Sequence, residues 1–296
     1  MASINTFLHA ASSELAGLSP SPRCDVEIMV MRVCSLSRST LITQADNALT
    51  SDQEAQLQEL VARRKHGEPI AYLVGSREFW SLDLLVSPAT LIPRPETELL
   101  VEIALTRIPP TTSPSGLSDI RQNAPLAIAD LGTGSGAIAL ALASERPNCR
   151  IIATDISETA LTVARANAQR HGLSQVQFRQ GNWLAAVAGE RLDLIVSNPP
   201  YVANGDQHLR QGDVAWEPRS ALQGGPDGLD EIRKIAFQAK QALVPGGILL
   251  LEHGHDQARA VRALMTRYGY KNLYTHQDYA RLDRVTEGRL AFEQTT

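Results

Sequence analysis

The pattern of apolar and polar positions divides the chain into a helical first part and an alternating second part. From residue 3 to about residue 73, apolar side chains recur at the spacing of one helix face, as in Phe7, Leu8, Ala11 and Leu15. From about residue 88 onward, short apolar runs alternate with helical patterns, which is typical of an α/β fold. We therefore expect a small helical domain followed by a larger α/β domain.

Charge patterning refines the helical part. Ser51-Asp52-Gln53-Glu54 has the form of a capping box and predicts a helix that runs to the basic cluster Arg63-Arg64-Lys65. Up to residue 74 the chain carries six basic and eight acidic residues. The cluster is therefore interpreted as the charged C-terminal end of a helix rather than as a nucleic-acid patch.

The second part predicts a mixed sheet of seven strands. A hairpin formed by Arg77–Trp80 and Leu82–Val86 connects the parts, and a helix begins near Pro95. The proline-rich stretch from residue 109 to about 125 predicts a surface loop. Domain boundaries are expected at residues 1–73, 74–92 (the hairpin linker) and 93–296. Strands are expected near 126–130, 150–154, 175–179, 192–196 and 246–252, with an antiparallel pair near 270–276 and 286–293.

Composition excludes several classes of protein. The 296 residues are 43% hydrophobic and 20% charged, which suits a large and a small globular domain. Neither a long apolar run nor a signal peptide is present, so we expect a cytoplasmic protein. Cys24, Cys34 and Cys149 are odd in number and scattered, which predicts buried, reduced thiols, and no residue spacing predicts a metal site. A net charge of −4 gives no general attraction to nucleic acid, and direct binding to it is not expected.

A glycine loop predicts a nucleoside cofactor. Gly132-Thr133-Gly134-Ser135-Gly136 follows one predicted strand and precedes a helix over about 137–145. Glycines allow close approach of a ligand at the positive end of a helix. Asp155 ends the next strand, where a carboxylate can accept both ribose hydroxyls. The glycines alone leave NAD and S-adenosylmethionine equally open, but Asp130 would repel a pyrophosphate and would attract a cationic amino-acid tail.

The tetrapeptide Asn198-Pro199-Pro200-Tyr201 favours S-adenosylmethionine. It follows the apolar run 192–196, at the carboxyl end of a predicted strand, where open α/β sheets bind ligands. Two prolines stiffen the turn. The Asn198 side-chain oxygen and the Pro199 carbonyl are acceptors for a planar NH2 group, and Tyr201 supplies a flat surface for its face. The two motifs together resemble a class I methyltransferase that acts on a planar nitrogen.

Further stretches resemble one family, the release factor glutamine methyltransferases (PrmC/HemK). They are Gly75–Trp80, Leu91–Glu98, Asp130–Gly136, Asn198–Tyr201, and Glu217-Pro218 followed by Gly224–Leu229. The resemblance implies a Rossmann-like class I fold with a helical N-terminal domain that recognises the substrate. It also implies transfer of a methyl group from S-adenosylmethionine to N5 of the glutamine in the Gly-Gly-Gln motif of release factors 1 and 2. We expect a monomer.

The resemblance also implies roles for individual residues. The glycine loop would hold the methionine end and the ribose, Asp155 would bind the ribose hydroxyls, and Trp183 would pack on the adenine. Asn198 would touch the cofactor as well as the substrate. Asn198, Pro199 and Tyr201 would be catalytic, and together with Pro200 they would bind the glutamine amide. Asn182 departs from the family, in which an acidic residue precedes the tryptophan.

Several alternatives stay open at this point. Trp183 could be a core residue, and Asp155 could cap the helix that begins near Ser157. Arg94 could contact the substrate or only tie the hairpin to the domain. For Glu217 and the loop 202–228, the length of the loop favours a role on the substrate side of the site. Alternative functions are methylation of adenine N6 or of a ribosomal-protein glutamine at the same site. A nicotinamide oxidoreductase and a catalytically silent adaptor are two more distant alternatives.

Overall fold

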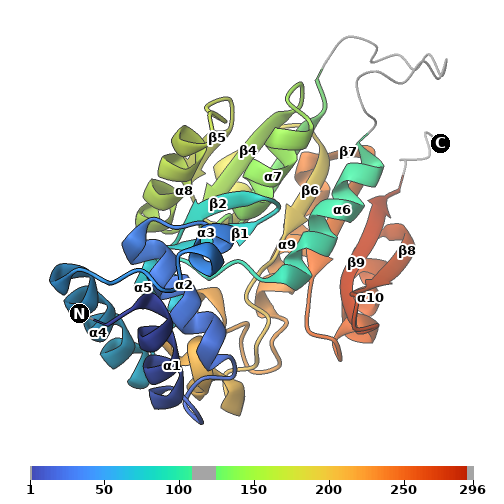
Figure 1. Cartoon of the computed structure of the whole chain (residues 1–296). Coiled ribbons are helices and arrows are strands. Elements are labelled where there is room, and N and C mark those ends of the chain that lie inside the picture. Colours follow the sequence, from blue (N-terminus) through green and yellow to red (C-terminus); the bar gives the residue numbers. More distant parts are fainter. Residues whose placement is uncertain (1, 109–124, 292–296) are drawn as a thin grey trace, which may run out of the picture. The chain divides into compact units, whose positions relative to one another are not determined.

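The computed structural model describes residues 2–108 and 125–291. The chain forms two compact units, coloured along the sequence in Figure 1. Unit 1 comprises Met1–Ser76 and Arg210–Trp216, and unit 2 comprises Arg77–Leu209 and Glu217–Thr296. The segment 210–216 thus belongs to the helical unit, although it comes from the loop after Tyr201. The predicted surface loop lies outside the described residues, except for its last residue.

Unit 1 is helical, as the spacing of its apolar residues predicts. Leu8, Leu15, Val26, Met29 and Leu57 are fully buried and belong to its single hydrophobic core. The elements are α1 (Ile4–Glu14), α2 (Pro22–Cys34), α3 (Arg38–Thr43), α4 (Ser51–Lys65), α5 (Ile70–Val74) and the short 3-10 helix η4 (Gly212–Trp216).

The capping box of α4 lies one residue earlier than predicted. Thr50, and not Ser51, is the N-cap: its hydroxyl accepts a hydrogen bond from Gln53 N at 3.2 Å. In return the Gln53 side chain accepts one from Thr50 N at 3.0 Å. Ser51 is the first helical residue, so Glu54 lies one position too far along the helix for the reciprocal bond.

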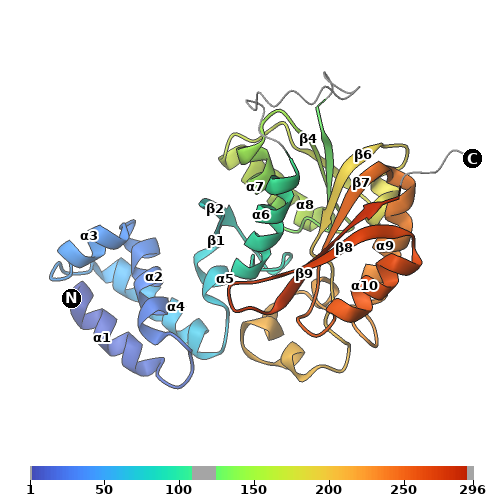
Figure 2. The same ribbon diagram turned by 90° about the vertical axis from the view of Figure 1, so that its right-hand side faces the viewer.

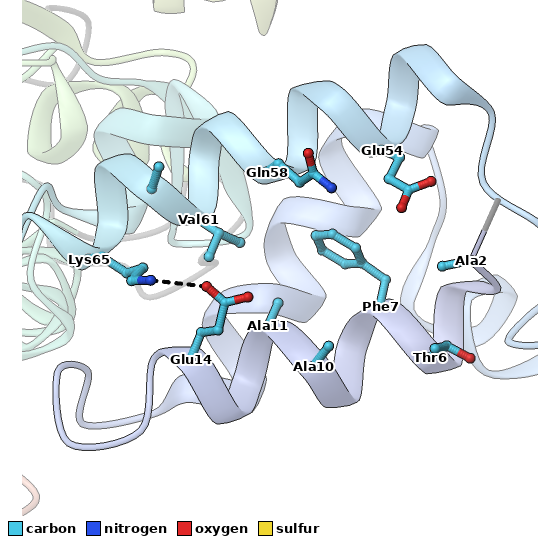
Figure 3. A pocket seen from close by; sticks show the side chains of 11 residues that line it. Ala2, Thr6, Phe7, Ala10, Ala11, Glu14, Glu54, Gln58, Val61 and Lys65 are labelled. Carbon is cyan, nitrogen blue, oxygen red and sulfur yellow. Dashed lines mark hydrogen bonds and ion pairs between the residues drawn. The ribbon is translucent and has the colours of Figure 1, made fainter.

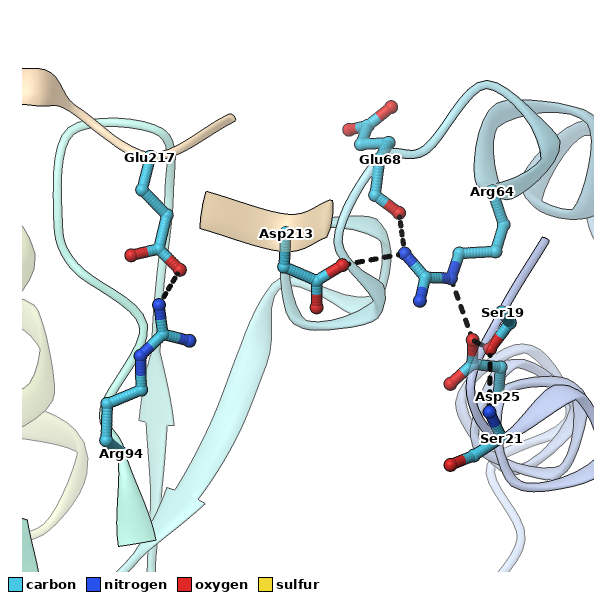
Figure 4. Close-up of polar contacts among 8 residues, drawn as sticks. All are labelled: Ser19, Ser21, Asp25, Arg64, Glu68, Arg94, Asp213 and Glu217. Carbon is cyan, nitrogen blue, oxygen red and sulfur yellow. Dashed lines mark hydrogen bonds and ion pairs between the residues drawn. The ribbon is translucent and has the colours of Figure 1, made fainter. Parts of the chain in front are cut away.

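The basic cluster at the end of α4 is only partly a solvated helix end. Arg63 and Lys65 form ion pairs with glutamates at the surface. Arg64, in contrast, is 6% exposed and donates to Asp25 Oδ2 at 2.7 Å and to Asp213 Oδ1 at 2.9 Å (Figure 4). A buried arginine therefore joins α2, α4 and the segment 210–216 within unit 1.

A groove runs between α1 and α4 on the surface of unit 1 (Figure 3). Its volume is about 250 Å³, and its floor includes Phe7, Ala11 and Val61. The ion pair between Lys65 Nζ and Glu14 Oε2, at 3.0 Å, lies at one end.

The predicted hairpin is present in the structure. Strands β1 (Ser76–Phe79) and β2 (Leu82–Leu85) form a two-stranded sheet. Trp80 and Ser81 between them both have positive φ, 53° and 59°, as a tight turn of the primed type requires. Asn167 of α8 (Glu158–Arg170) holds β2: its side chain bonds both the N–H and the carbonyl of Leu85, at 2.6 and 3.0 Å.

Unit 2 is built around a seven-stranded mixed sheet, as predicted. The strand order is β5-β4-β3-β6-β7-β9-β8, and β9 runs antiparallel to both of its neighbours, β7 and β8, whereas the other pairs are parallel. The direction of winding reverses between β3 and β6, which are paired neighbours, and this is where such sheets bind ligands. The strands are β3 (Ala127–Leu131), β4 (Arg150–Asp155), β5 (Gln177–Gln180), β6 (Leu192–Ser197), β7 (Leu243–Glu252), β8 (Tyr270–Gln277) and β9 (Asp283–Leu290).

Helices cover both faces of the sheet, so its central strands are apolar on both sides. In β3, Ile128 packs into the core on one face, whereas Ala129 and Leu131 pack into the core on the other. Figure 2 shows α6 (Glu98–Arg107) and α7 (Ala137–Glu145) on one side and α9 (Asp230–Ala242) and α10 (Ala258–Arg267) on the other. The remaining 3-10 helices are η1 (Pro95–Thr97), η2 (Trp183–Val187), η3 (Gln207–Arg210) and η5 (Arg219–Ala221). In the described part of the chain, no helix has the length and apolarity needed to span a membrane.

The prediction that the three cysteines are buried is wrong. Cys24 on α2 is exposed, and Cys34 and Cys149 are half-buried, because these two lie at the edges of the cores and not within them.

Candidate active site

The glycine loop leaves the carboxyl end of β3 in a conformation that favours glycine. Gly132, Gly134 and Gly136 have φ of 74°, 57° and 88°. The N–H groups of Gly132 and Thr133 donate to the Thr154 carbonyl at 2.9 and 2.8 Å, which fastens the loop to β4. No atom lies within 4 Å of a Cβ built on Gly134, so the middle of the loop borders open space.

Asp130 is a fully buried carboxylate beneath this loop. Its Oδ2 accepts from the Thr133 hydroxyl at 2.6 Å and from Ala139 N at 3.2 Å. Its Oδ1 has no hydrogen-bond partner among residues 2–108 and 125–291. Burial raises the pKa of Asp130 to about 7. A cation beside Oδ1 would both satisfy this oxygen and favour the ionised form.

Asp155 lies at the end of β4 and is tied to the glycine loop. Its Oδ2 accepts from Gly134 N and its Oδ1 from Ser157 N, each at 2.9 Å. The capping alternative for Asp155 is wrong, because the Ser157 hydroxyl is the group that caps α8, accepting from Ala160 N at 3.2 Å. Each Asp155 oxygen accepts one bond and retains capacity for a hydroxyl donor. The next residue, Ile156, exposes 66% of its surface, and this apolar side chain was not predicted from the sequence to be part of the site.

Trp183 lies against the same loop. Its ring would come within 2.9 Å of a Cβ on Gly132, and its Nε1 donates to Glu231 Oε2 at 2.7 Å. The ring is half-buried and also packs on the core under η2. Asn182, which precedes it, is exposed.

The Asn198–Tyr201 motif leaves the carboxyl end of β6, next to the glycine loop. The hydroxyl of Ser197 donates to the Leu131 carbonyl at 2.7 Å, so the ends of β6 and β3 are joined directly. Asn198 is half-buried, and its Nδ2 donates to Thr97 Oγ1 at 3.0 Å. The Asn198 Oδ1 atom is therefore turned away from Thr97. The adjacency of the two motifs follows from the pairing of β3 with β6.

Two glycines from the long loop pack against the backbone of this motif. A Cβ on Gly224 would lie 2.5 Å from the Pro200 carbonyl oxygen, and one on Gly228 would lie 2.2 Å from that of Tyr201. Gln257 Nε2 donates to the same Tyr201 carbonyl at 2.9 Å. The motif is thus held rigidly from the side of the loop 202–228.

A second buried carboxylate, Glu252, ends β7 beside the motif. The Tyr201 hydroxyl donates to its Oε1 at 3.3 Å, and the neighbouring Thr97 hydroxyl favours the ionised form of this carboxylate. Burial raises the pKa of Glu252 to about 7 and raises that of the Tyr201 hydroxyl above its ordinary range. Neither Thr97 nor Glu252 was predicted from the sequence to have a role in the site. The sequence does mark Glu252, because it is a charged residue at the end of the otherwise uncharged strand Leu243–Glu252.

Arg94 and Glu217 form an ion pair. Arg94 Nη2 donates to Glu217 Oε1 at 2.6 Å, and the Glu217 side chain is fully buried (Figure 4). Glu217 directly follows the segment 210–216. The pair therefore anchors the return of the long loop to the stretch that leads into η1. Groups of side chains that could hold a metal ion are absent from the described ranges.

Comparison with known proteins gives two domain matches and many relatives. Residues 6–75 match the PrmC N-terminal domain, and residues 117–217 match the methyltransferase small domain. The chain is 48% identical to the release factor glutamine methyltransferase of Escherichia coli (strain K12), over 96% of this chain and 97% of that protein. It is 51% identical to the protein of that name from Xylella fastidiosa (strain Temecula1), over 90% and 93%.

A solved structure also shares the fold. A methyltransferase from Pyrococcus furiosus superimposes with a TM-score of 0.52 at 18% identity, over 82% of this chain and all of that chain. The predicted class I methyltransferase fold is confirmed.

Proposed function

Since the chain belongs to the family of release factor glutamine methyltransferases, we propose that it methylates N5 of the glutamine in the Gly-Gly-Gln motif of release factors 1 and 2. Family membership confirms the predicted enzyme class, an S-adenosylmethionine-dependent methyltransferase. The observation that carries the substrate proposal is the high identity over nearly the whole length of both chains.

The residues at the end of β3 and β4 fit S-adenosylmethionine. The unpaired Oδ1 of buried Asp130 suits the cationic amino group of the methionine part. The open side of Gly134 gives access to the loop, and Asp155 suits the ribose hydroxyls. Ile156 and Trp183 offer apolar surface for the adenine. When bound, this cofactor supplies a methyl group on an electrophilic sulfonium.

The residues at the end of β6 fit a glutamine amide. An amide nitrogen is a weak nucleophile, so the reaction depends on aim and on stabilising the positive charge that develops on nitrogen. Asn198 Oδ1 and the Pro199 carbonyl each accept one amide hydrogen. Tyr201 covers the face of the amide, and Pro200 stiffens the turn. No strong general base is required, because the methylated nitrogen is acidic enough to lose its proton to water.

A labelled-methyl assay distinguishes this substrate from its alternatives. Purified release factor, ribosomal protein and an adenine-containing oligonucleotide are each incubated with the enzyme and labelled S-adenosylmethionine. We expect label in release factor alone, and none in a release factor whose motif glutamine is replaced by alanine. Label in the ribosomal protein or the oligonucleotide would assign the site to one of those alternatives.

We also propose that residues 1–73 recognise the protein substrate, with a hairpin linker at 74–92 and catalysis in 93–296. The match of residues 6–75 to a domain of its own supports this division. A fragment beginning near Leu73 should bind S-adenosylmethionine like the full chain but methylate release factor poorly. Calorimetry and the methyl-transfer assay measure the two properties, and full activity in the fragment would contradict the proposal.

The setting of the enzyme follows from its substrate. Release factors act in translation, so we propose a cytoplasmic enzyme that works as a monomer and contacts no nucleic acid directly. Sedimentation at working concentration checks the oligomeric state.

A further inference from the structure

The side-chain amide of Asn198 can take two orientations, related by a half turn, that fill nearly the same space. The amide oxygen and nitrogen are almost isosteric, so hydrogen-bond partners decide which one faces the substrate. Nδ2 donates to Thr97 Oγ1 at 3.0 Å. If the amide were turned over, its NH2 group would face the substrate amide, and two donors would meet.

The direction of the hydrogen bond between Thr97 and Asn198 depends on where the Thr97 hydroxyl hydrogen points. A threonine hydroxyl has one hydrogen and two acceptor lone pairs. Thr97 is 4% exposed, and its hydroxyl is close enough to the Glu252 carboxylate to favour the ionised form of that group. An ionised carboxylate can only accept, so the hydroxyl hydrogen points to Glu252 and a lone pair points to Asn198 Nδ2. This chain of bonds specifies one orientation of the Asn198 amide.

Glu252 also receives the second side chain of the motif. The Tyr201 hydroxyl donates to Oε1 at 3.3 Å. Burying a carboxylate is unfavourable unless its environment compensates for lost hydration. The neighbouring cation Arg284 is itself paired with Asp278 at 3.2 Å, and Glu252 Oε2 has no hydrogen-bond partner within the described ranges. Stability alone therefore gives no reason for a carboxylate at this position.

We propose that Thr97 and Glu252 are positioning residues for methyl transfer: Glu252 orders the Thr97 hydroxyl and Tyr201, and Thr97 holds Asn198 with Oδ1 toward the substrate amide. This inference rests on the proposed role of Asn198 in binding the substrate. It adds to the four-residue motif two residues that lie 101 and 54 positions away from Asn198 in sequence (198 − 97 and 252 − 198).

We call the proposed series of contacts from Glu252 through Thr97 to Asn198 the relay. The ionisation state of Glu252 makes the relay depend on pH. Burial raises the pKa of Glu252 to about 7, and the facing groups are Glu96 on η1, Tyr201 after β6, and Arg284 on β9. Below that pH the carboxyl group carries a proton, can donate to Thr97, and releases the Thr97 hydrogen toward Asn198. The orientation of the amide is then no longer specified, so kcat falls as the pH drops through about 7.

Thr97→Val tests the relay, because valine keeps the shape of threonine and removes its hydroxyl. We expect kcat to fall roughly 10- to 100-fold, with little change in KM for release factor or in S-adenosylmethionine affinity by calorimetry. Thr97→Ser, the matched control, keeps the hydroxyl and should retain nearly the wild-type kcat. In an Asn198→Ala background, adding Thr97→Val should cause no further fall in kcat. An unchanged kcat, or an equal loss in both backgrounds, would overturn the relay.

Glu252→Gln provides a second test that does not depend on how well the valine variant folds. Glutamine accepts through Oε1 but does not titrate. With cofactor saturating, the fall in kcat below pH 7 should disappear, whereas persistence of the wild-type pH profile would contradict a role for Glu252. If wild-type enzyme leaves release factor unmethylated, the proposed substrate fails. If it methylates release factor and both variants match it, only the relay fails.

Discussion

The ends of β3 and β6 are neighbours in the sheet but are built by different means. The end of β3 consists of backbone turns and carboxylates close together in sequence, from Asp130 to Asp155. The end of β6 is held by side chains and glycines from distant segments, among them Thr97, Gly228 and Glu252. We propose that the end of β3 binds the cofactor and the end of β6 the substrate, and we call them the cofactor half and the substrate half. The comparison indicates that the cofactor half can be recognised from a local motif, whereas the substrate half depends on tertiary packing.

The largest expected effect separates the two halves by removing Asn198. Asn198→Ala deletes the proposed acceptor for the substrate amide and leaves the glycine loop in place. By analogy with loss of one preorganised group from an oxyanion hole, single-turnover methyl transfer should slow roughly 100-fold, about 3 kcal/mol. Affinity for S-adenosylmethionine should change far less. Asn198→Asp keeps an acceptor and should be partly active; normal turnover in the alanine variant would remove the catalytic assignment.

Asp155→Ala should give the opposite pattern. It removes the carboxylate that we propose accepts the ribose hydroxyls, and charge-assisted hydrogen bonds of this kind are worth on the order of 1.5–3 kcal/mol. The rise in melting temperature on adding S-adenosylmethionine should shrink, while the rate at saturating cofactor stays near that of wild type. The ligand-free melting temperature is the control, because Asp155 also bonds Gly134 and Ser157. Stabilisation by NAD instead of S-adenosylmethionine would contradict the cofactor assignment.

Much of the cofactor half follows from local sequence. The apolar run before Gly132, the three glycines and Asp155 are all set by neighbouring residues, and all seven strands were predicted. What local pattern could not supply is contact across the chain. The sequence predicts that Arg64 is a solvated residue at the end of a helix. In the structure it is bonded to Asp213, which is 149 residues away and could not be identified from a local pattern. The partners Thr97 and Glu252 of the Asn198–Tyr201 motif likewise depend on how η1 and β7 pack beside β6.

A glycine substitution tests the rigidity of the substrate half. A Cβ at Gly228 would approach the Tyr201 carbonyl oxygen at 2.2 Å, so Gly228→Ala must displace the motif. Overpacking of this kind typically lowers the free energy of unfolding by about 1–3 kcal/mol. The rate of methyl transfer should also fall, because the motif is displaced. The matched control is Gly189→Ala, where φ is 80° but no atom lies within 4 Å of the new Cβ. The control should lose only about 1 kcal/mol of stability and keep its activity; equal activity in both variants would argue against a rigid motif.

The smallest expected effect is the pH dependence of the cofactor half. The pKa of Asp130 is raised to about 7, above its unfolded value, so in the free enzyme the group is protonated below pH 7. A cationic ligand favours the carboxylate, so binding below pH 7 should release a proton, and affinity should fall at most about tenfold per pH unit. Calorimetry in buffers of different ionisation enthalpy measures this release. Asp130→Asn should abolish it, and a wild-type affinity independent of pH would contradict the account.

The most direct test of the central claim is to locate the transferred methyl group. Release factor treated with wild-type enzyme and S-adenosylmethionine is digested and sequenced by tandem mass spectrometry, beside a sample treated with the Asn198→Ala variant. The account predicts one methyl group on the side-chain nitrogen of the Gly-Gly-Gln glutamine with wild type, and a strongly reduced amount with the variant. A methyl group on any other residue, or equal methylation by both enzymes, would contradict it.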